Sequence, residues 1–99
     1  MKMLFLVTDS EYEPQCMNTL REKGVTGYTV IPEVQGMGRT GLKLGDRVHP
    51  GASVVVIAVI EDGAVPHILE CIRACKAEKK LCESTRAWIL PVEGALHEG

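Results

Sequence analysis

The sequence has no long hydrophobic run and no excess of one charge. Its 99 residues carry a formal net charge of −2, which argues against a strongly basic nucleic-acid-binding module. No segment approaches the roughly 18 apolar residues that a membrane-spanning helix needs. The apolar start, residues 3–7, runs into polar residues without a small-residue cleavage site, unlike a signal peptide. We therefore expect one cytoplasmic domain, residues 1–99, that neither binds nucleic acid nor inserts into a membrane.

The sequence also lacks a recognisable catalytic pattern. Ser10, Ser53 and Ser84 have no His and Asp partners at a patterned spacing. A cysteine nucleophile would need an activating base. His49 or His67 would serve as that base only by accident of folding. We therefore expect a protein that is not an enzyme and has no catalytic residues.

The four cysteines are expected to be thiols, because disulfides are rare in a reducing compartment. His67, Cys71, Cys75 and Cys82 are spaced by four, four and seven residues, so they would follow one side of a continuous helix. His and Cys are the ligands that zinc prefers, but such a stripe offers at most two ligands to one metal. We expect no metal, with Cys71 and Cys75 packing as small apolar groups. A metal-responsive or metal-binding trimer that uses these four residues is the alternative.

Hydrophobic patterning predicts four strands, because four short runs are apolar or rich in β-branched residues. They are expected at residues 2–8, 28–31, 54–60 and 87–92. Pro32 interrupts the second run, which resumes at Val34. A proline has no N–H for a ladder hydrogen bond, so this strand should lie at an edge or contain a bulge.

Two helices are predicted between these strands. Pro14 suits the first turn of one, and Gly24 is placed as its stop. The other follows Asp62, a candidate N-cap, and carries apolar residues at helical spacing from Val65 to Cys75.

The resulting order, β-α-β-β-α-β, predicts an α+β, ferredoxin-like sandwich. Two right-handed crossovers would form a four-stranded antiparallel sheet with both helices on one face. The valines of residues 54–60 place apolar groups on both sides of the sheet. Self-association would cover the face that the helices leave open.

Residues 35–52 show neither the helical nor the strand period of apolar residues. Five of the ten glycines fall within residues 36–51, together with basic residues. Residues 36–41 match G-x-G-x-x-G, but no helical pattern follows, so a dinucleotide site is not predicted. We expect a long functional loop whose backbone amides can approach an anion, with charge from Arg39 or Lys43.

Three short motifs carry a resemblance to a known family. Residues 24–30 read GVTGYTV, residues 34–39 read VQGMGR, and residues 86–93 read RAWILPVE. In this order and spacing, with one extra residue between the first two, they resemble the PII signal-transduction (nitrogen regulatory) family. The resemblance runs from Gly24 to Glu93, about seven-tenths of the chain.

The resemblance implies a homotrimer with ligand sites in the clefts between subunits. It implies an adenine nucleotide as the effector, with Thr29 at the adenine and Arg86 at the phosphates. It places the glycine-rich backbone at Gly36 and Gly38, with Arg39, near the same phosphates. The family's T-loop would be residues 35–52, and its contacts with an unidentified target protein, a transporter or an enzyme, would involve Lys43, Asp46, Arg47 and His49.

The chain also departs from the family pattern. Residues 79–85 contain no glycine, where the family has a glycine-rich phosphate loop, and residues 36–52 contain no tyrosine that could be uridylylated. Val54 and Val56 stand where the family has charged residues, and the arginines after P-V-E are missing. These departures predict a PII-like relative whose ligand has changed or been lost. The function expected is a regulatory protein whose effector controls the loop at residues 36–52.

Overall fold

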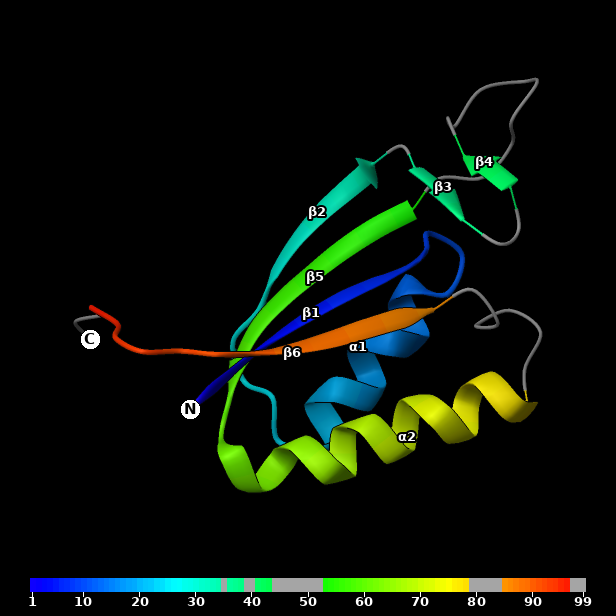
Figure 1. Ribbon diagram of the computed structural model, residues 1–99. Coiled ribbons are helices and arrows are strands. Elements are labelled where there is room, and N and C mark those ends of the chain that lie inside the picture. The colour runs from blue at the N-terminus through cyan, green and yellow to red at the C-terminus, as the bar shows by residue number, and fades with distance from the viewer. Residues whose placement is uncertain (35, 39–40, 44–52, 79–84, 97–99) are drawn as a thin grey trace.

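A four-stranded antiparallel sheet with two helices on one face forms the body of the computed structural model (Figure 1). The structure describes residues 1–34, 36–38, 41–43, 53–78 and 85–96. Its sheet has the order β2-β5-β1-β6, as the ferredoxin-like pattern predicts. These strands are β1 (Lys2–Asp9), β2 (Thr29–Val34), β5 (Ser53–Ile60) and β6 (Arg86–Pro91).

Helix α1 (Glu13–Glu22) ends where the sequence places its stop. Pro14 lies in its first turn, and Arg21 lies in its last turn, where a cation favours the negative end of the helix dipole. Gly24 adopts a φ of 94°, a left-handed conformation that suits glycine. The chain turns there, and the amide of Val25 donates to the carbonyl of Leu20 at 3.0 Å.

Strand β2 lies at one edge of the sheet and contains the irregularity that Pro32 predicts. It pairs with β5 through Ile31 and again through Val34, with a register shift between them. Glu33 takes a φ of 55° within this shift. The strand thereby continues past a residue that cannot donate a ladder hydrogen bond.

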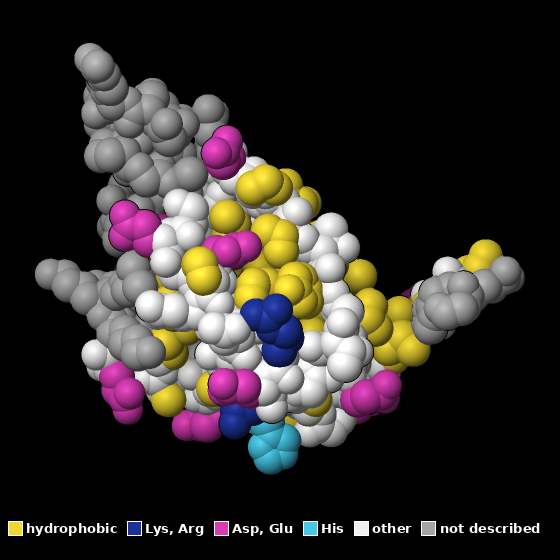
Figure 2. Space-filling model, turned by 180° about the vertical axis from the view of Figure 1, so that it is seen from behind, with side chains coloured by type: hydrophobic (Ala, Val, Ile, Leu, Met, Phe, Trp, Pro, Cys, Tyr) yellow, Lys and Arg dark blue, Asp and Glu magenta, His cyan; other side chains and the backbone are white. Residues whose placement is uncertain are grey.

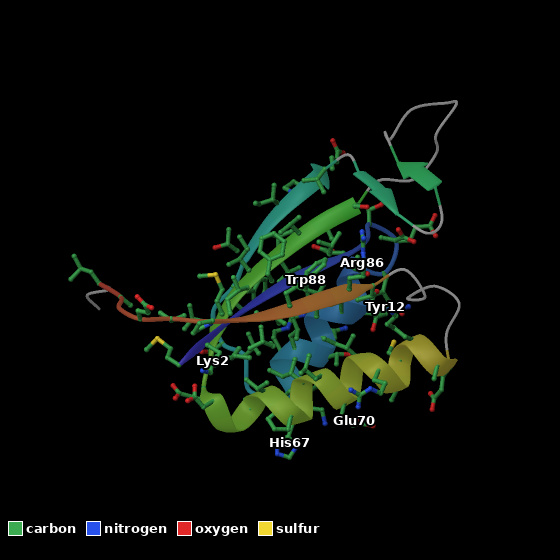
Figure 3. All side chains as sticks on the ribbon, viewed as in Figure 1. Lys2, Tyr12, His67, Glu70, Arg86 and Trp88 are labelled. Atoms are coloured by element: carbon green, nitrogen blue, oxygen red, sulfur yellow. The ribbon has the colours of Figure 1, made fainter. Side chains whose placement is uncertain are left out.

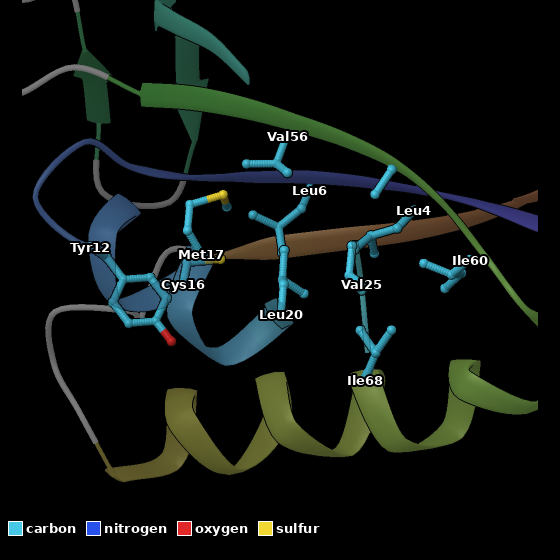
Figure 4. Close-up of a cluster of buried hydrophobic side chains, with 11 residues drawn as sticks. Leu4, Leu6, Tyr12, Cys16, Met17, Leu20, Val25, Val56, Ile60 and Ile68 are labelled. Carbon is cyan, nitrogen blue, oxygen red and sulfur yellow. The ribbon is translucent and has the colours of Figure 1, made fainter. Parts of the chain in front are cut away.

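The hydrophobic core lies between the sheet and the two helices (Figure 4). Leu4 and Leu6 of β1 and Val56 of β5 are fully buried there. They pack with Leu20 of α1 and Ile68 of α2 (Val65–Glu78), which are 1% exposed. Successive side chains of a strand point to opposite faces of the sheet. One set of apolar residues therefore packs against the helices, and the other set lies on the opposite face.

The structure corrects two details of the sequence analysis. Residues 35–52 were expected to contain no strand, but β3 (Gly36–Gly38) and β4 (Gly41–Lys43) pair antiparallel. Glycines give no side-chain alternation from which such short strands can be read. Asp62 was expected to cap α2, but it lies inside a 3₁₀ turn, η1 (Asp62–Ala64), and its carboxylate pairs with the terminal amine of Met1.

Candidate functional site

One face of the sheet carries apolar side chains that the helices do not cover. We call it the open face; it consists of Met3, Phe5, Val7, Val55, Ile57, Val59, Trp88 and Leu90, which the strand registers place together. Trp88 and Val59 are each 49% exposed. This confirms the prediction that residues 54–60 place apolar groups on both sides, since Val56 is fully buried on the helix side.

A cross-strand row on the open face runs from one sheet edge to the other. Thr29 pairs with Ile57, Ile57 with Phe5, and Phe5 with Trp88. The rings of Phe5 and Trp88 meet edge to face, with their centroids 6.1 Å apart, a favourable geometry for aromatic pairs. In the view from behind, exposed apolar side chains gather in the middle of the molecule next to a basic side chain, with acidic side chains towards the margin (Figure 2).

The ligand-binding residues expected from the sequence do not come together within one chain. Thr29 begins β2 at one edge of the sheet, and Arg86 begins β6 at the other. Three strand spacings separate these edges, which amounts to about 14 Å at roughly 4.8 Å per spacing. Gly36 and Gly38 lie in β3, beyond the end of β2.

The predicted partner-binding loop is described only in part. Lys43 is the last residue of β4. Four further residues expected in the ligand site or the loop lie outside the described residues: Arg39, Asp46, Arg47 and His49.

A pocket of about 450 Å³ lies between α2 and the outer strand β6. We call it the α2–β6 groove; its lining residues are Leu69, Ile72, Arg73, Lys76, Thr85, Arg86, Ala87 and Trp88. Arg86 and Trp88 lie on β6 beside the C-terminal half of α2 (Figure 3). The Arg86 guanidinium carbon is 5.9 Å from the centre of the Trp88 ring, within the range of a cation–π contact.

Sequence reasoning missed the contribution of α2 to this groove. Arg73 and Lys76 read as the solvent side of an amphipathic helix, and both are exposed. Their spacing of three residues places them on one side of the helix. That spacing was the available signal, but only the packing of β6 beside α2 shows that Arg86 joins them.

A buried hydroxyl pair fixes the start of β6. The Oγ1 atoms of Thr8 and Thr85 are 2.7 Å apart, and the two residues are 2% and 1% exposed. Each hydroxyl gives the other the hydrogen bond that a buried polar group requires. The pair thereby fixes the backbone next to Arg86, the residue that follows Thr85.

The expected cysteine thiols are present where the structure describes them, at Cys16, Cys71 and Cys75. Cys75 packs against the core, as the packing interpretation predicted, and its Sγ shares a 2.7 Å hydrogen bond with the Tyr12 hydroxyl. His67 is exposed on α2. Over the described residues, no group of three or more His, Cys, Asp or Glu side chains could hold a metal ion. Cys82 lies outside those residues.

Among the described residues, one ion pair lies within α2 and another lies just before it. Arg73 and Glu70 form an exposed pair at 2.6 Å, one turn apart on α2. Before α2, the hydrogen bond from the Met1 amine holds the pKa of the Asp62 carboxyl below its ordinary value of 3.8. The helices that the structure describes include none long and apolar enough to cross a membrane.

Comparison with known proteins identifies relatives by sequence and by fold. The family model for nitrogen regulatory protein P-II matches residues 1–96. Among solved structures, the PII-like protein CPII from Thiomonas intermedia K12, bound to ADP, AMP and bicarbonate, is 19% identical with a TM-score of 0.73. That match covers 90% of this chain and 88% of CPII.

Two further structures share the fold. The apo form of CPII is 20% identical with a TM-score of 0.68, covering 89% of this chain and 84% of CPII. A protein from Thermus thermophilus described as PII-like and signalling is 16% identical with a TM-score of 0.61, covering 89% of this chain and 81% of its own. No curated protein matches the sequence.

Proposed function

Because the chain belongs to the nitrogen regulatory protein P-II family, we propose that it is a PII-like signalling protein rather than an enzyme. It works in the cytoplasm as a homotrimer that binds an adenine nucleotide in a cleft between subunits. It controls a target protein, a transporter or an enzyme, through residues 36–52. One observation carries the proposal: Thr29 and Arg86 lie at opposite edges of one sheet, with exposed apolar rows between them.

The open face supports self-association. Val59, Trp88 and Leu90 are between 44% and 49% exposed, although a small domain gains most of its stability by removing such side chains from water. Copies of the chain that pack by this face bury it. They also bring the β2 edge of one copy towards the β6 edge of the next, so that Thr29 and Arg86 of different subunits border one cleft.

The nucleotide part of the proposal rests on the relatives and on the chemistry at Arg86. Three structures of CPII contain ADP and AMP. In this chain, Arg86 offers a guanidinium that suits phosphate, and Trp88 beside it offers a flat ring for stacking. Residues 36–52 follow β2, the strand that Thr29 begins, so a ligand in the cleft would act on the loop through this strand.

Thermal unfolding with a panel of adenine nucleotides tests the effector. ADP, AMP or ATP at millimolar concentration should raise the Tm, because a ligand that binds only the folded state stabilises it. Arg86→Ala should abolish the rise, while Arg21→Ala, which removes an exposed arginine of α1, should preserve it. A Tm that no adenine nucleotide changes would rule out the nucleotide as effector.

Regulation through the loop needs its own test. The charge-reversed variant Lys43→Glu/Arg47→Glu should lose binding to the target protein that the wild type captures, and should keep its nucleotide response. Lys23→Glu, at the far end of α1, is the control that should retain the target. Equal capture by the loop variant and the wild type would assign the target to another surface.

A further inference from the structure

Strand β6 leaves one main-chain edge of the sheet unpaired among the described residues. It is the last strand in the order β2-β5-β1-β6, and β1 is its only described partner. The amide of Val92 donates to the carbonyl of Met1, which continues the register of these two strands. Hydrogen-bonded pairs alternate along an antiparallel ladder, so this bond fixes which residues of β6 face β1. The N–H and C=O groups of Ala87 and Ile89 therefore point outward, to the free edge.

The two edges of the sheet differ in how well they are protected against a further strand. On β2, Pro32 and the register shift interrupt the ladder, and such features discourage pairing with another chain. Strand β6 pairs with β1 in one unbroken register, and its proline, Pro91, is its last residue. No charged residue lies between Arg86 and Pro91. An extended segment therefore finds a regular and unprotected edge at β6.

The α2–β6 groove lies along this free edge. Its described lining residues come from α2 and from positions 85–88, and none belongs to β1 or β5. The strand registers place the side chains of Arg86 and Trp88 on the open face, so β6 offers the groove its main-chain edge and the side chain of Ala87. The volume of about 450 Å³ lies within the roughly 300–1,000 Å³ of ligand-binding clefts. A strand added to β6 would therefore run through the groove beside α2.

The wall that α2 provides is apolar in one part and basic in the other. Leu69 and Ile72 are half-buried in this wall. Arg73 and Lys76 lie farther along the helix and are exposed. Arg73 pairs with Glu70, but these side chains are 73% and 68% exposed, and such a pair contributes little. None of the groove's described lining residues is acidic, so the wall complements a segment that carries apolar side chains and a carboxylate.

We infer that the α2–β6 groove binds an extended acidic segment of a partner protein, which adds to the four-stranded sheet as a fifth strand beside β6. Main-chain groups of β6 provide the ladder hydrogen bonds. The apolar part of α2 packs against the segment's apolar side chains, and Arg73 and Lys76 bind its carboxylate. In this mode of recognition the main chain supplies affinity and the side chains supply selectivity. The side chain of Arg86 takes no part, so the inference does not depend on the nucleotide effector.

Synthetic peptides test the groove in the intact protein. A blocked peptide of about seven residues, a common strand length, alternates threonine with an inner row of two valines and one glutamate. A second peptide has lysine in place of the glutamate. Each carries a fluorescein label, whose anisotropy measures binding. The wild type should bind the glutamate peptide about tenfold more tightly than the lysine peptide, because only the carboxylate gains charge-assisted hydrogen bonds from α2.

Charge reversal on α2 should invert this preference. The variant Arg73→Glu/Lys76→Glu should bind the lysine peptide more tightly than the glutamate peptide, since opposite charges then meet again. Arg21→Glu/Lys23→Glu makes the same charge change at the end of α1 and should keep the wild-type preference. Circular dichroism and the Tm verify that each variant is folded. A preference that is the same in the wild type and the α2 variant overturns the groove as the binding site.

Methylation of the peptide's amides separates strand addition from a charge contact alone. Alternate amides of an added strand face β6, and a methylated amide cannot donate to the ladder. Two further glutamate peptides are therefore N-methylated at one alternate set of amides or at the other. One should bind about tenfold more weakly than the parent peptide, and the other should bind like the parent. Equal affinities of these two peptides overturn pairing with β6, and a wild type that binds neither unmethylated peptide overturns the whole inference.

Discussion

The hydroxyls of Thr8 and Thr85 form a hydrogen bond of 2.7 Å in a site where both residues are almost completely buried. The pair joins the end of β1 to the residue before β6. It therefore anchors the strand that carries Arg86 and Trp88, and a change at Thr8 reaches the candidate site without touching a ligand.

Replacement of either threonine by valine should lower the free energy of unfolding by about 1–3 kcal/mol, because the remaining buried hydroxyl loses its partner. The double variant Thr8→Val/Thr85→Val should be less destabilised than the sum of the single variants, because no orphaned hydroxyl is left. Urea unfolding at one protein concentration measures all four proteins. Additive effects would show that the two hydroxyls do not depend on each other.

The open face should control assembly. Val59→Glu places a charge on this exposed apolar surface, and a charge is costly to bury without a partner. Light scattering should give a mass of about three times 10.8 kDa for the wild type and the mass of one chain for the variant. His67→Glu changes an exposed residue of α2 and is the control that should keep the wild-type mass. A Val59→Glu protein of unchanged mass would move the interface to another surface.

The Tyr12–Cys75 hydrogen bond links the start of α1 to α2 across the core. Tyr12→Phe should cost about 0.5–1.5 kcal/mol of unfolding free energy, the usual net value of one hydrogen bond. Tyr28→Phe removes a hydroxyl from a side chain that is 37% exposed and should change stability by less than about 0.5 kcal/mol. Equal effects of the two changes would show that the contact with Cys75 does not stabilise the fold.

The sequence predicts the fold because its signals are local. The apolar and β-branched runs identify the four strands of the main sheet, and Pro14 and Gly24 bracket α1 within a residue or two. Pro32 predicts that β2 lies at an edge or contains a bulge, because its missing N–H cannot join the ladder, and the strand has both features.

The groove and its supports were not predicted, because they depend on residues far apart in the chain. Thr8 and Thr85 are 77 positions apart, and Tyr12 and Cys75 are 63 apart. No periodicity connects such pairs. Asp62 shows the same limit: its cap pattern is a local rule, and a contact with the chain's first residue, 61 positions away, overrides it.

The turn after α1 should depend on one glycine. Gly24→Ala should destabilise the protein by about 1–2 kcal/mol, because a side chain disfavours the left-handed conformation, although a Cβ there would meet no atom within 4 Å. Gly63→Ala is the matched control, since it also has open space but no positive φ. It should be neutral or slightly stabilising. If both changes have the same effect on the Tm, the strain assigned to Gly24 is absent.

The ion pair between Asp62 and the Met1 amine should make a small, pH-dependent contribution. The carboxyl has a lowered pKa in the folded state, so its contribution is present above the ordinary value of 3.8 and is lost as the pH falls through the folded-state pKa. The wild type should therefore be more stable than Asp62→Asn at neutral pH, and the two should converge in acid. Added salt should narrow the gap, because the pair is exposed. Glu61→Gln makes the same charge change one residue earlier, and a pH profile identical to that of Asp62→Asn would assign the effect to net charge rather than to this pair.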